Sequence, residues 1–156
     1  MKYILSICLI TFILHACNES SKTTTDNIMK DSTKVAGGTQ IPSTLLTSYR
    51  WKLSELSGKK IDSINGQEAF ILFNAEDSSV AGRAGCNRFG GKYTTNDKTI
   101  TFSPFFSTKM ACADMWAETT LLGLVESINS FTVTESELRL MHNGETVAFF
   151  ESREKD

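Results

Sequence analysis

The chain has 156 residues, of which 40% are hydrophobic, and its formal net charge is −2 at pH 7. This length and composition suit one folded domain with a single core and a tail. The nearly balanced charge offers no basic excess for phosphates, so we expect no nucleic-acid partner.

Residues 1–16 have the features of a lipoprotein signal peptide. Lys2 supplies a short positive region, and positions 3–14 form an apolar run of twelve residues. That run is too short to cross a bilayer, which takes about 20 residues. It closes on the sequence Leu-His-Ala-Cys, which resembles a lipobox, where a small residue precedes the cysteine that is lipidated. The alternative is an ordinary signal peptide cleaved near Ala16.

Cys17 is therefore the expected lipid-modified N-terminus of the mature chain. The next residue is Asn18, and not the aspartate linked to retention at the inner membrane. We expect the protein in the bacterial cell envelope, with the membrane as a partner through its lipid anchor in the outer membrane.

Residues 17–48 are expected to form a flexible, lipidated tether. They are rich in Ser, Thr, Lys, Asp and Gly, and such a composition buries too little apolar surface to offset the entropy lost on ordering. A flexible segment of about 30 residues has an r.m.s. span of roughly 30 Å, which holds a domain clear of the membrane. Residues 41–46 are the one apolar patch of the tether. The role that this patch suggests is docking on the edge of the folded domain.

Residues 49–150 carry the alternation and the turn signals of short β-strands. Asn143-Gly144 is a strong signal for a tight hairpin near their end. The charged residues 151–156 are expected to form a frayed tail. Strands are expected near residues 51–54, 68–73, 80–86, 90–93, 99–102, 131–134, 138–141 and 146–150.

One amphipathic helix is expected at about residues 113–129, because apolar residues recur there at helical spacing. This stripe comprises Ala113, Ala117, Leu121, Leu124 and Ile128. A core-facing role is the simpler interpretation, and a partner groove is the alternative. Because strands and helices do not alternate, we predict a mainly β (α+β) fold. It would be a curved antiparallel sheet or incomplete β-barrel of about seven or eight strands, with the helix inserted before the last three.

The densest glycine run of the chain lies in its middle and includes a cysteine. It reads G-x-x-G-C-N-x-x-x-G-x-Y from Gly82 to Tyr93, and T-x-M-A-C follows, ending at Cys112. These motifs resemble those of the META domain family, which includes bacterial heat-shock lipoproteins of the HslJ type. The resemblance covers about residues 49–150. It implies the same barrel-like architecture and suggests a context of envelope stress or secretion.

Cys86 and Cys112 are the cysteines that remain once the leader is removed and Cys17 is lipidated. Outside the cytoplasm, two thiols meet oxidising conditions and can pair. A disulfide between them is one prediction, and a pair of buried free thiols is a second. A reactive Cys86, activated by neighbouring arginines, is a third.

His142 is the single histidine of the mature chain, and it falls in a predicted hairpin turn. A Ser-His or Cys-His mechanism needs a positioned base, and a zinc site needs three or four ligands. We therefore expect no catalytic residues, no metal and no cofactor, and we predict that the protein is not an enzyme.

We predict that the mature protein, as a monomer, binds or supports an envelope protein partner. The alternative is a carrier that holds a lipid or hydrophobic small molecule in the barrel cavity, and the histidine count disfavours a hydrolase. The candidate contact residues are Arg88 and Phe89 in the glycine run, and Phe105, Phe106 and Trp116 where the sheet meets the helix. Turn formation and core packing are the simpler roles for them.

Overall fold

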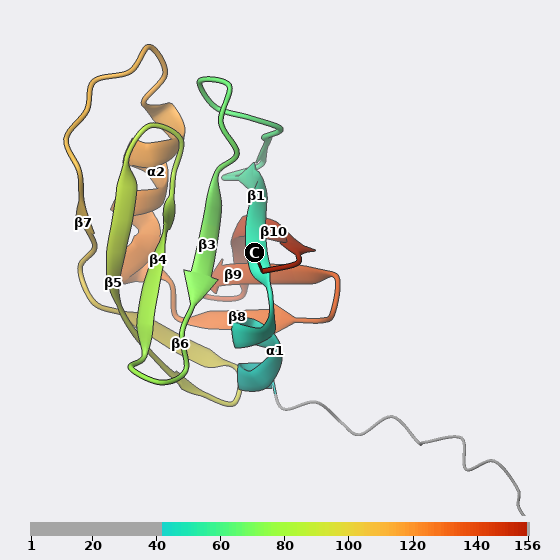
Figure 1. Cartoon of the computed structure of the whole chain (residues 1–156). Helices are drawn as coiled ribbons and strands as arrows, with labels where there is room; N and C mark the ends of the chain where they lie inside the picture. Colours follow the sequence, from blue (N-terminus) through green and yellow to red (C-terminus); the bar gives the residue numbers. More distant parts are fainter. Residues whose placement is uncertain (1–41, 156) are drawn as a thin grey trace, which may run out of the picture. The chain divides into compact units, whose positions relative to one another are not determined.

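The computed structural model describes residues 42–155, which contain ten strands, two α-helices and one 3-10 turn (Figure 1). Their order is α1 (Pro42–Ser48), β1 (Arg50–Leu56), β2 (Lys59–Lys60), β3 (Phe70–Phe73), β4 (Ser79–Arg83), β5 (Arg88–Asn96), β6 (Thr99–Phe102), β7 (Phe106–Ser107), α2 (Trp116–Leu124), η1 (Val125–Ser127), β8 (Ser130–Val133), β9 (Glu137–His142) and β10 (Glu145–Arg153). The predictions for Cys17, the signal peptide and most of the tether lie outside the described residues.

Eight of the described strands form a closed antiparallel barrel in the order β1-β3-β4-β5-β6-β8-β9-β10. The barrel closes where β10 pairs with β1 over six residue pairs, whereas β6 and β8 share a single pair. The two-residue strands β2 and β7 add to β1 and β5. The mainly β class, the strand number and a helix before the last three strands are confirmed, and the barrel is closed where an incomplete one was expected.

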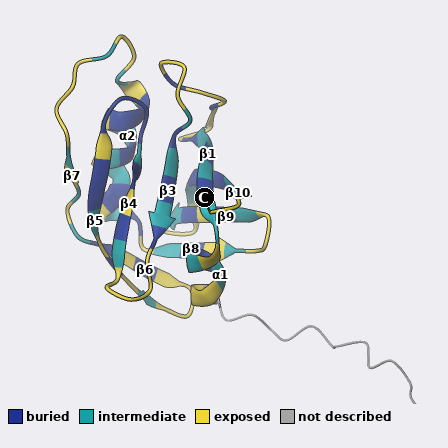
Figure 2. Ribbon diagram, viewed as in Figure 1, coloured by how far each residue is buried: buried dark blue, intermediate teal, exposed yellow. Residues whose placement is uncertain are grey.

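Alternation along the strands explains the core. In β1 the side chains of Trp51, Leu53 and Leu56 are almost fully buried, and their neighbours face outward. Burying a side chain of this size contributes about 1.5–3 kcal/mol, so each strand has a strong preference for one register. The buried positions of all strands meet in one apolar cluster that fills the barrel, while exposed residues gather at the turns (Figure 2).

The second helix begins later than expected. The predicted helix at 113–129 is observed as α2 and η1, and Ala113 is exposed and lies outside it. The Asp114 carboxylate accepts a hydrogen bond of 2.9 Å from the Trp116 N–H, a local turn that competes with helix before that point. Ala117, Leu121 and Val125 are buried, so the apolar stripe faces the core as the simpler interpretation predicted.

Both ends of the folded part extend further than expected. Residues 42–48 form α1 and are not tether, because the Leu46 side chain is completely buried and its carbonyl accepts a hydrogen bond of 2.8 Å from Trp51 Nε1–H. At the other end, β10 runs to Arg153, and Ser152 pairs with Trp51, so residues 151–153 are strand and not frayed tail. Within residues 42–155, no helix has the length and apolarity to cross a membrane.

Leu121→Ala should lower the free energy of unfolding by about 2–5 kcal/mol, because it removes a buried side chain and leaves a cavity. Leu124 is only half-buried, so Leu124→Ala should cost less. Urea denaturation followed by circular dichroism measures both. The matched control is Glu126→Ala, an exposed position that should change stability by less than about 0.5 kcal/mol. Equal effects at positions 121 and 126 would contradict a core role for the stripe.

Candidate functional site

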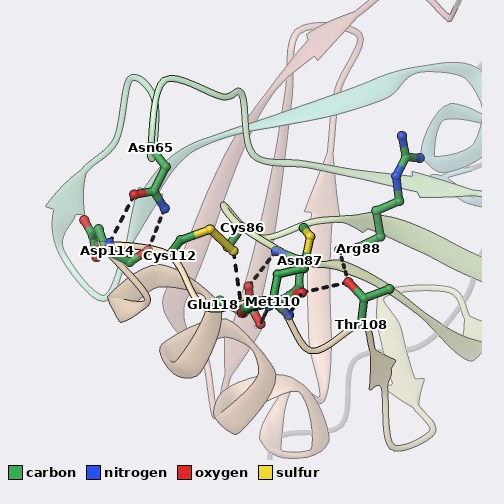
Figure 3. Close-up of a disulfide and its surroundings, with 9 residues drawn as sticks. All are labelled: Asn65, Cys86, Asn87, Arg88, Thr108, Met110, Cys112, Asp114 and Glu118. Atoms are coloured by element: carbon green, nitrogen blue, oxygen red, sulfur yellow. Dashed lines mark hydrogen bonds between the residues drawn. A yellow bond between two sulfur atoms is a disulfide. The ribbon is translucent and has the colours of Figure 1, made fainter.

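Cys86 and Cys112 are joined as a disulfide in the structure, with their Cα atoms 6.0 Å apart (Figure 3). Cys86 belongs to the turn between β4 and β5. Cys112 belongs to residues 103–115, which cross from β6 to α2 and which we call the crossover segment. The bond therefore fixes the crossover segment to the end of the β4–β5 hairpin.

Asn87 makes a second set of links to the same segment, and only 2% of it is exposed. Its side-chain oxygen accepts hydrogen bonds from the Met110 N–H and the Thr108 hydroxyl, both at 2.7 Å. Its Nδ2 donates to the Met110 carbonyl at 3.0 Å and to Glu118 Oε1 at 2.8 Å. Its main-chain N–H donates to Glu118 Oε2 at 2.8 Å. Every polar atom of this side chain is satisfied, which is what a buried amide requires.

The structure joins Asn87 and Glu118 across the fold, from the β4–β5 turn to α2. Glu118 is 6% exposed, and it precedes Leu121, Leu122 and Val125 by three, four and seven residues. A carboxylate at this spacing on an apolar stripe is the signal that would have marked it as buried and hydrogen-bonded.

Two glycines of the motif make room for aromatic rings inside the barrel. A Cβ at Gly82 would lie 2.6 Å from the Phe89 ring, and one at Gly91 would lie 2.5 Å from the Phe105 ring. The two rings stack with their centroids 5.0 Å apart. Phe89 is buried, and Phe105 packs partly buried against the core. Both rings therefore have the core-packing role that was the simpler interpretation for these candidate contact residues.

A third glycine makes room for a ring on the outside. A Cβ at Gly90 would lie 2.7 Å from the Phe106 ring, which covers this glycine and is 74% exposed. Met110 is 57% exposed, and Trp116 is 37% exposed with Lys59 Nζ 4.3 Å from its ring centroid. Phe106 and Met110 belong to the crossover segment, and Trp116 opens α2. Of the predicted contact aromatics, Phe106 and Trp116 are thus exposed.

Arg88 points away from the disulfide on the outer face of β5 (Figure 3). Its register partner on β4 is Arg83, the other arginine near Cys86 in the glycine run. Arg83 directly precedes the four-residue turn that holds Cys86 and Asn87, and Arg88 directly follows it. Two cations therefore lie side by side on the outer face, close to Phe106.

Two carboxylates of this side of the barrel already have cationic partners. Glu68 Oε1 lies 2.6 Å from Arg50 Nη1, and Asp77 Oδ2 lies 3.1 Å from Lys92 Nζ. A hydrogen bond from Ser79 together with the Lys92 ammonium lowers the pKa of Asp77 to about 2, from an ordinary value of 3.8.

The Asp77 interactions should add a small acid-sensitive term to stability. Because the pKa of Asp77 is lowered in the folded state, the contribution is present above pH 3.8 and is lost as the pH falls towards 2. Asp77→Asn should therefore show a smaller loss of melting temperature between pH 4 and pH 2 than the parent protein. Glu76→Gln, the exposed neighbour, is the matched control and should follow the parent. Identical pH profiles for all three proteins would contradict the assignment.

The remaining expectations concern histidine and metal. His142 Nδ1 lies 2.6 Å from the Ser127 carbonyl oxygen, and its Nε2 lies 3.1 Å from Asn143 Nδ2. In the described part of the chain, no group of three or more His, Cys, Asp and Glu residues is placed to hold a metal ion.

The grooves found on residues 42–155 lie on the outer surface. Three have volumes of about 710, 550 and 510 Å³. The first is lined by outward side chains of β3 and β4, among them Phe70, Leu72 and Ala81. The barrel interior is occupied by the apolar cluster.

The fold and the disulfide-linked hairpin define a small closed antiparallel barrel with one helix inserted before its last three strands. The chain belongs to the META domain family, whose model matches residues 44–154. The resemblance inferred from the glycine and cysteine motifs is thereby confirmed. The META domain is not a known enzymatic family.

Three solved structures share the fold. One described only as an NMR structure is 23% identical, with a TM-score of 0.56 and coverage of 70% of this chain and 92% of the other. An NMR structure of a protein from Burkholderia xenovorans is 22% identical, with a TM-score of 0.60 and coverage of 83% and 99%. The crystal structure of a DUF4847 family protein from Bacteroides vulgatus is 15% identical, with a TM-score of 0.50 and coverage of 73% and 99%. None of the curated proteins matches this chain.

Proposed function

We propose that the chain is a lipid-anchored protein of the bacterial envelope whose META domain acts, without catalysis, by binding a protein partner. The observation that carries this proposal is the set of large apolar side chains exposed between residues 106 and 116, which are Phe106, Met110 and Trp116. Aromatic residues and methionine are enriched in the contact surfaces of proteins. The exposure of all three in one short stretch of sequence is the feature that a binding role explains.

The attachment of the crossover segment supports the same proposal. The disulfide and the hydrogen bonds of Asn87 hold Met110 and Thr108 in place before any partner arrives. A segment that is already ordered loses less conformational entropy when it binds, which favours affinity. A loop with no function beyond connection would not need links of both kinds.

The filled interior makes the carrier alternative the weaker one. A carrier of this fold holds its ligand inside the barrel, and the space there is occupied by side chains such as Trp51, Phe73 and Phe131. The groove of about 710 Å³ is on the outer face, where a bound lipid would stay in contact with water.

Photocrosslinking in intact cells tests the binding role. A photoreactive amino acid at position 106 or 110 should give a discrete crosslinked band, and one at the exposed position 135 on the β8–β9 turn should not. The double variant Phe106→Ala/Met110→Ala, probed from position 116, should lose the same band while keeping its melting temperature. Equal crosslinking from positions 106, 110 and 135, or none from any of them, would overturn the proposal.

Cys17→Ser should abolish incorporation of labelled fatty acid and leave a soluble or uncleaved product. The physical reason is that the Cys17 thiol is the atom that carries the lipid if Leu-His-Ala-Cys is a lipobox. Metabolic labelling followed by fractionation measures both effects, with Cys8→Ser as the control that should label normally. A Cys17→Ser protein that still carries fatty acid would contradict lipid anchoring.

A further inference from the structure

Arg83 and Arg88 form a pair of like charges across the β4–β5 hairpin. They are direct register partners at the end of the β4–β5 hairpin. Alternation places both on the outer face, since Val80, Gly82 and Phe89 of the same strands are buried. Like charges directly opposite each other on neighbouring strands destabilise a sheet. The pair therefore opposes folding locally.

Neither arginine forms an ion pair with a carboxylate of residues 42–155. Within that range, the ion pairs at 4.0 Å or less use Arg50, Lys52, Lys92, Arg139 and Arg153, and neither Arg83 nor Arg88 takes part. A carboxylate supplied from outside would therefore offset the repulsion between the two guanidinium groups.

An exposed aromatic ring lies two residues along β5 from this pair. Gly90 follows Arg88 by two residues and so shares its face, and the exposed ring of Phe106 covers Gly90. Residues two apart on a strand are separated by about 7 Å. Ala81, the register partner of Gly90, adds apolar surface on β4. The outer face thus offers two cations and, about 7 Å away, an aromatic ring.

We propose that Arg83, Arg88 and Phe106 form a binding site for an extended peptide of the partner protein. The peptide would carry a carboxylate side chain at one position and a large apolar side chain two positions later. The carboxylate accepts hydrogen bonds from the Arg83 and Arg88 guanidinium groups, and the apolar side chain packs on the Phe106 ring. This inference rests on the proposed function and states which chemistry the partner presents.

An extended peptide fits these observations better than a free anion or a lipid surface. Side chains at alternate positions of an extended peptide lie on one face about 7 Å apart, which matches the spacing from Arg88 to the Phe106 ring. The three side chains come from the neighbouring strands β4, β5 and β7, so the peptide would lie across their outer face. Charge complementarity then selects an acidic sequence.

The test uses the full mature chain in a zwitterionic detergent and a dye-labelled nonapeptide, Thr-Thr-Thr-Glu-Thr-Trp-Thr-Thr-Thr, with blocked ends. Fluorescence anisotropy at low salt should show saturable binding that weakens as salt is raised. Replacing the peptide glutamate by glutamine should weaken binding at least tenfold. The protein variants Arg83→Gln/Arg88→Gln and Phe106→Ala should each weaken it by a similar factor.

Control variants separate a binding role from a structural one. Lys98→Gln removes an exposed cation at the far end of β5 and should leave peptide affinity unchanged. Arg88→Gln should keep or raise the melting temperature, because it removes one of two adjacent like charges, while lowering affinity. A fall in melting temperature that accounts for the lost binding would overturn the inference.

The remaining outcomes distinguish this inference from the proposed function. Peptide binding that is absent, or that ignores the arginines, while crosslinks from position 106 persist, overturns the site and leaves partner binding in place. Attachment to phosphatidylglycerol vesicles through the same arginines, without peptide binding, would assign the pair to lipid headgroups and also overturn it. Loss of crosslinks together with arginine-dependent peptide binding would instead count against the proposed function in cells.

Discussion

Glu118→Ala is expected to lower the free energy of unfolding by about 3 kcal/mol. The change removes both acceptors used by the Asn87 main-chain N–H and its Nδ2, and Asn87 is 2% exposed. Each donor left buried without an acceptor costs about 1–3 kcal/mol, and bonds to a carboxylate are at the strong end of the range. Urea denaturation of the disulfide-intact protein measures the loss.

Glu118→Gln separates the hydrogen bonds from the volume of the side chain. Glutamine has the same shape, but its NH2 group would face one of the two donors of Asn87. We therefore expect Glu118→Gln to recover less than half of the stability lost in Glu118→Ala. In the double variant with Asn87→Ala, the two losses should fall well short of additive, because the two residues share bonds. A fully stable Glu118→Gln protein would show that the second acceptor is dispensable.

Cys86→Ser/Cys112→Ser is expected to lower the free energy of unfolding by about 3–4 kcal/mol. The cysteines are 26 residues apart, and in the chain-entropy model a cross-link over such a loop restricts the unfolded chain by this amount. The comparison is guanidinium denaturation of the variant against the parent protein. The parent protein denatured in excess reductant is the control and should approach the variant.

The oxidation state is read directly from the mass of protein purified from the envelope without reductant. Two thiols that alkylate in that preparation would contradict the disulfide at Cys86 and Cys112. A variant as stable as the parent would show that the hydrogen bonds of Asn87 hold the crossover segment without help from the sulfur atoms.

The strand pattern was predictable because burial alternates along each strand. Trp51, Leu53 and Leu56 show where β1 lies without any knowledge of its neighbours. Local signals of this kind depend on the strand's own residues, and so do the Asn143-Gly144 turn and the glycine-cysteine motif of the family. The positive φ angles of both turn residues agree with a tight hairpin there.

The errors arose where contacts distant in sequence decide the outcome. Phe89 was a candidate contact residue, but its ring lies buried against the bare Gly82 backbone across the β4–β5 pair. The charged residues 151–153 were expected to fray, but they pair with β1, about a hundred positions earlier in the chain. Neither the register of a strand pair nor its distant partner is visible in a single sequence.

For the same reason, the sequence predicted the candidate site only in part. Arg83 and Arg88 both lie in the glycine motif, but only the structure shows that they are direct register partners. Phe106 was identified as an aromatic near the helix, but its place over Gly90 depends on the two-residue strand β7. The sequence can suggest such residues as candidates, but only the register of the paired strands shows that they share one face.

The thin contact between β6 and β8 gives the barrel a preferred line of opening. These strands share one residue pair, whereas β1 and β10 share six. Separation along this line breaks few bonds, chiefly those from the Ile100 and Phe131 N–H groups, and leaves the other ladders intact. A local opening of this kind needs less free energy than global unfolding and exposes two strand edges at once. At high temperature and high protein concentration, this line is therefore where two chains would begin to exchange strands.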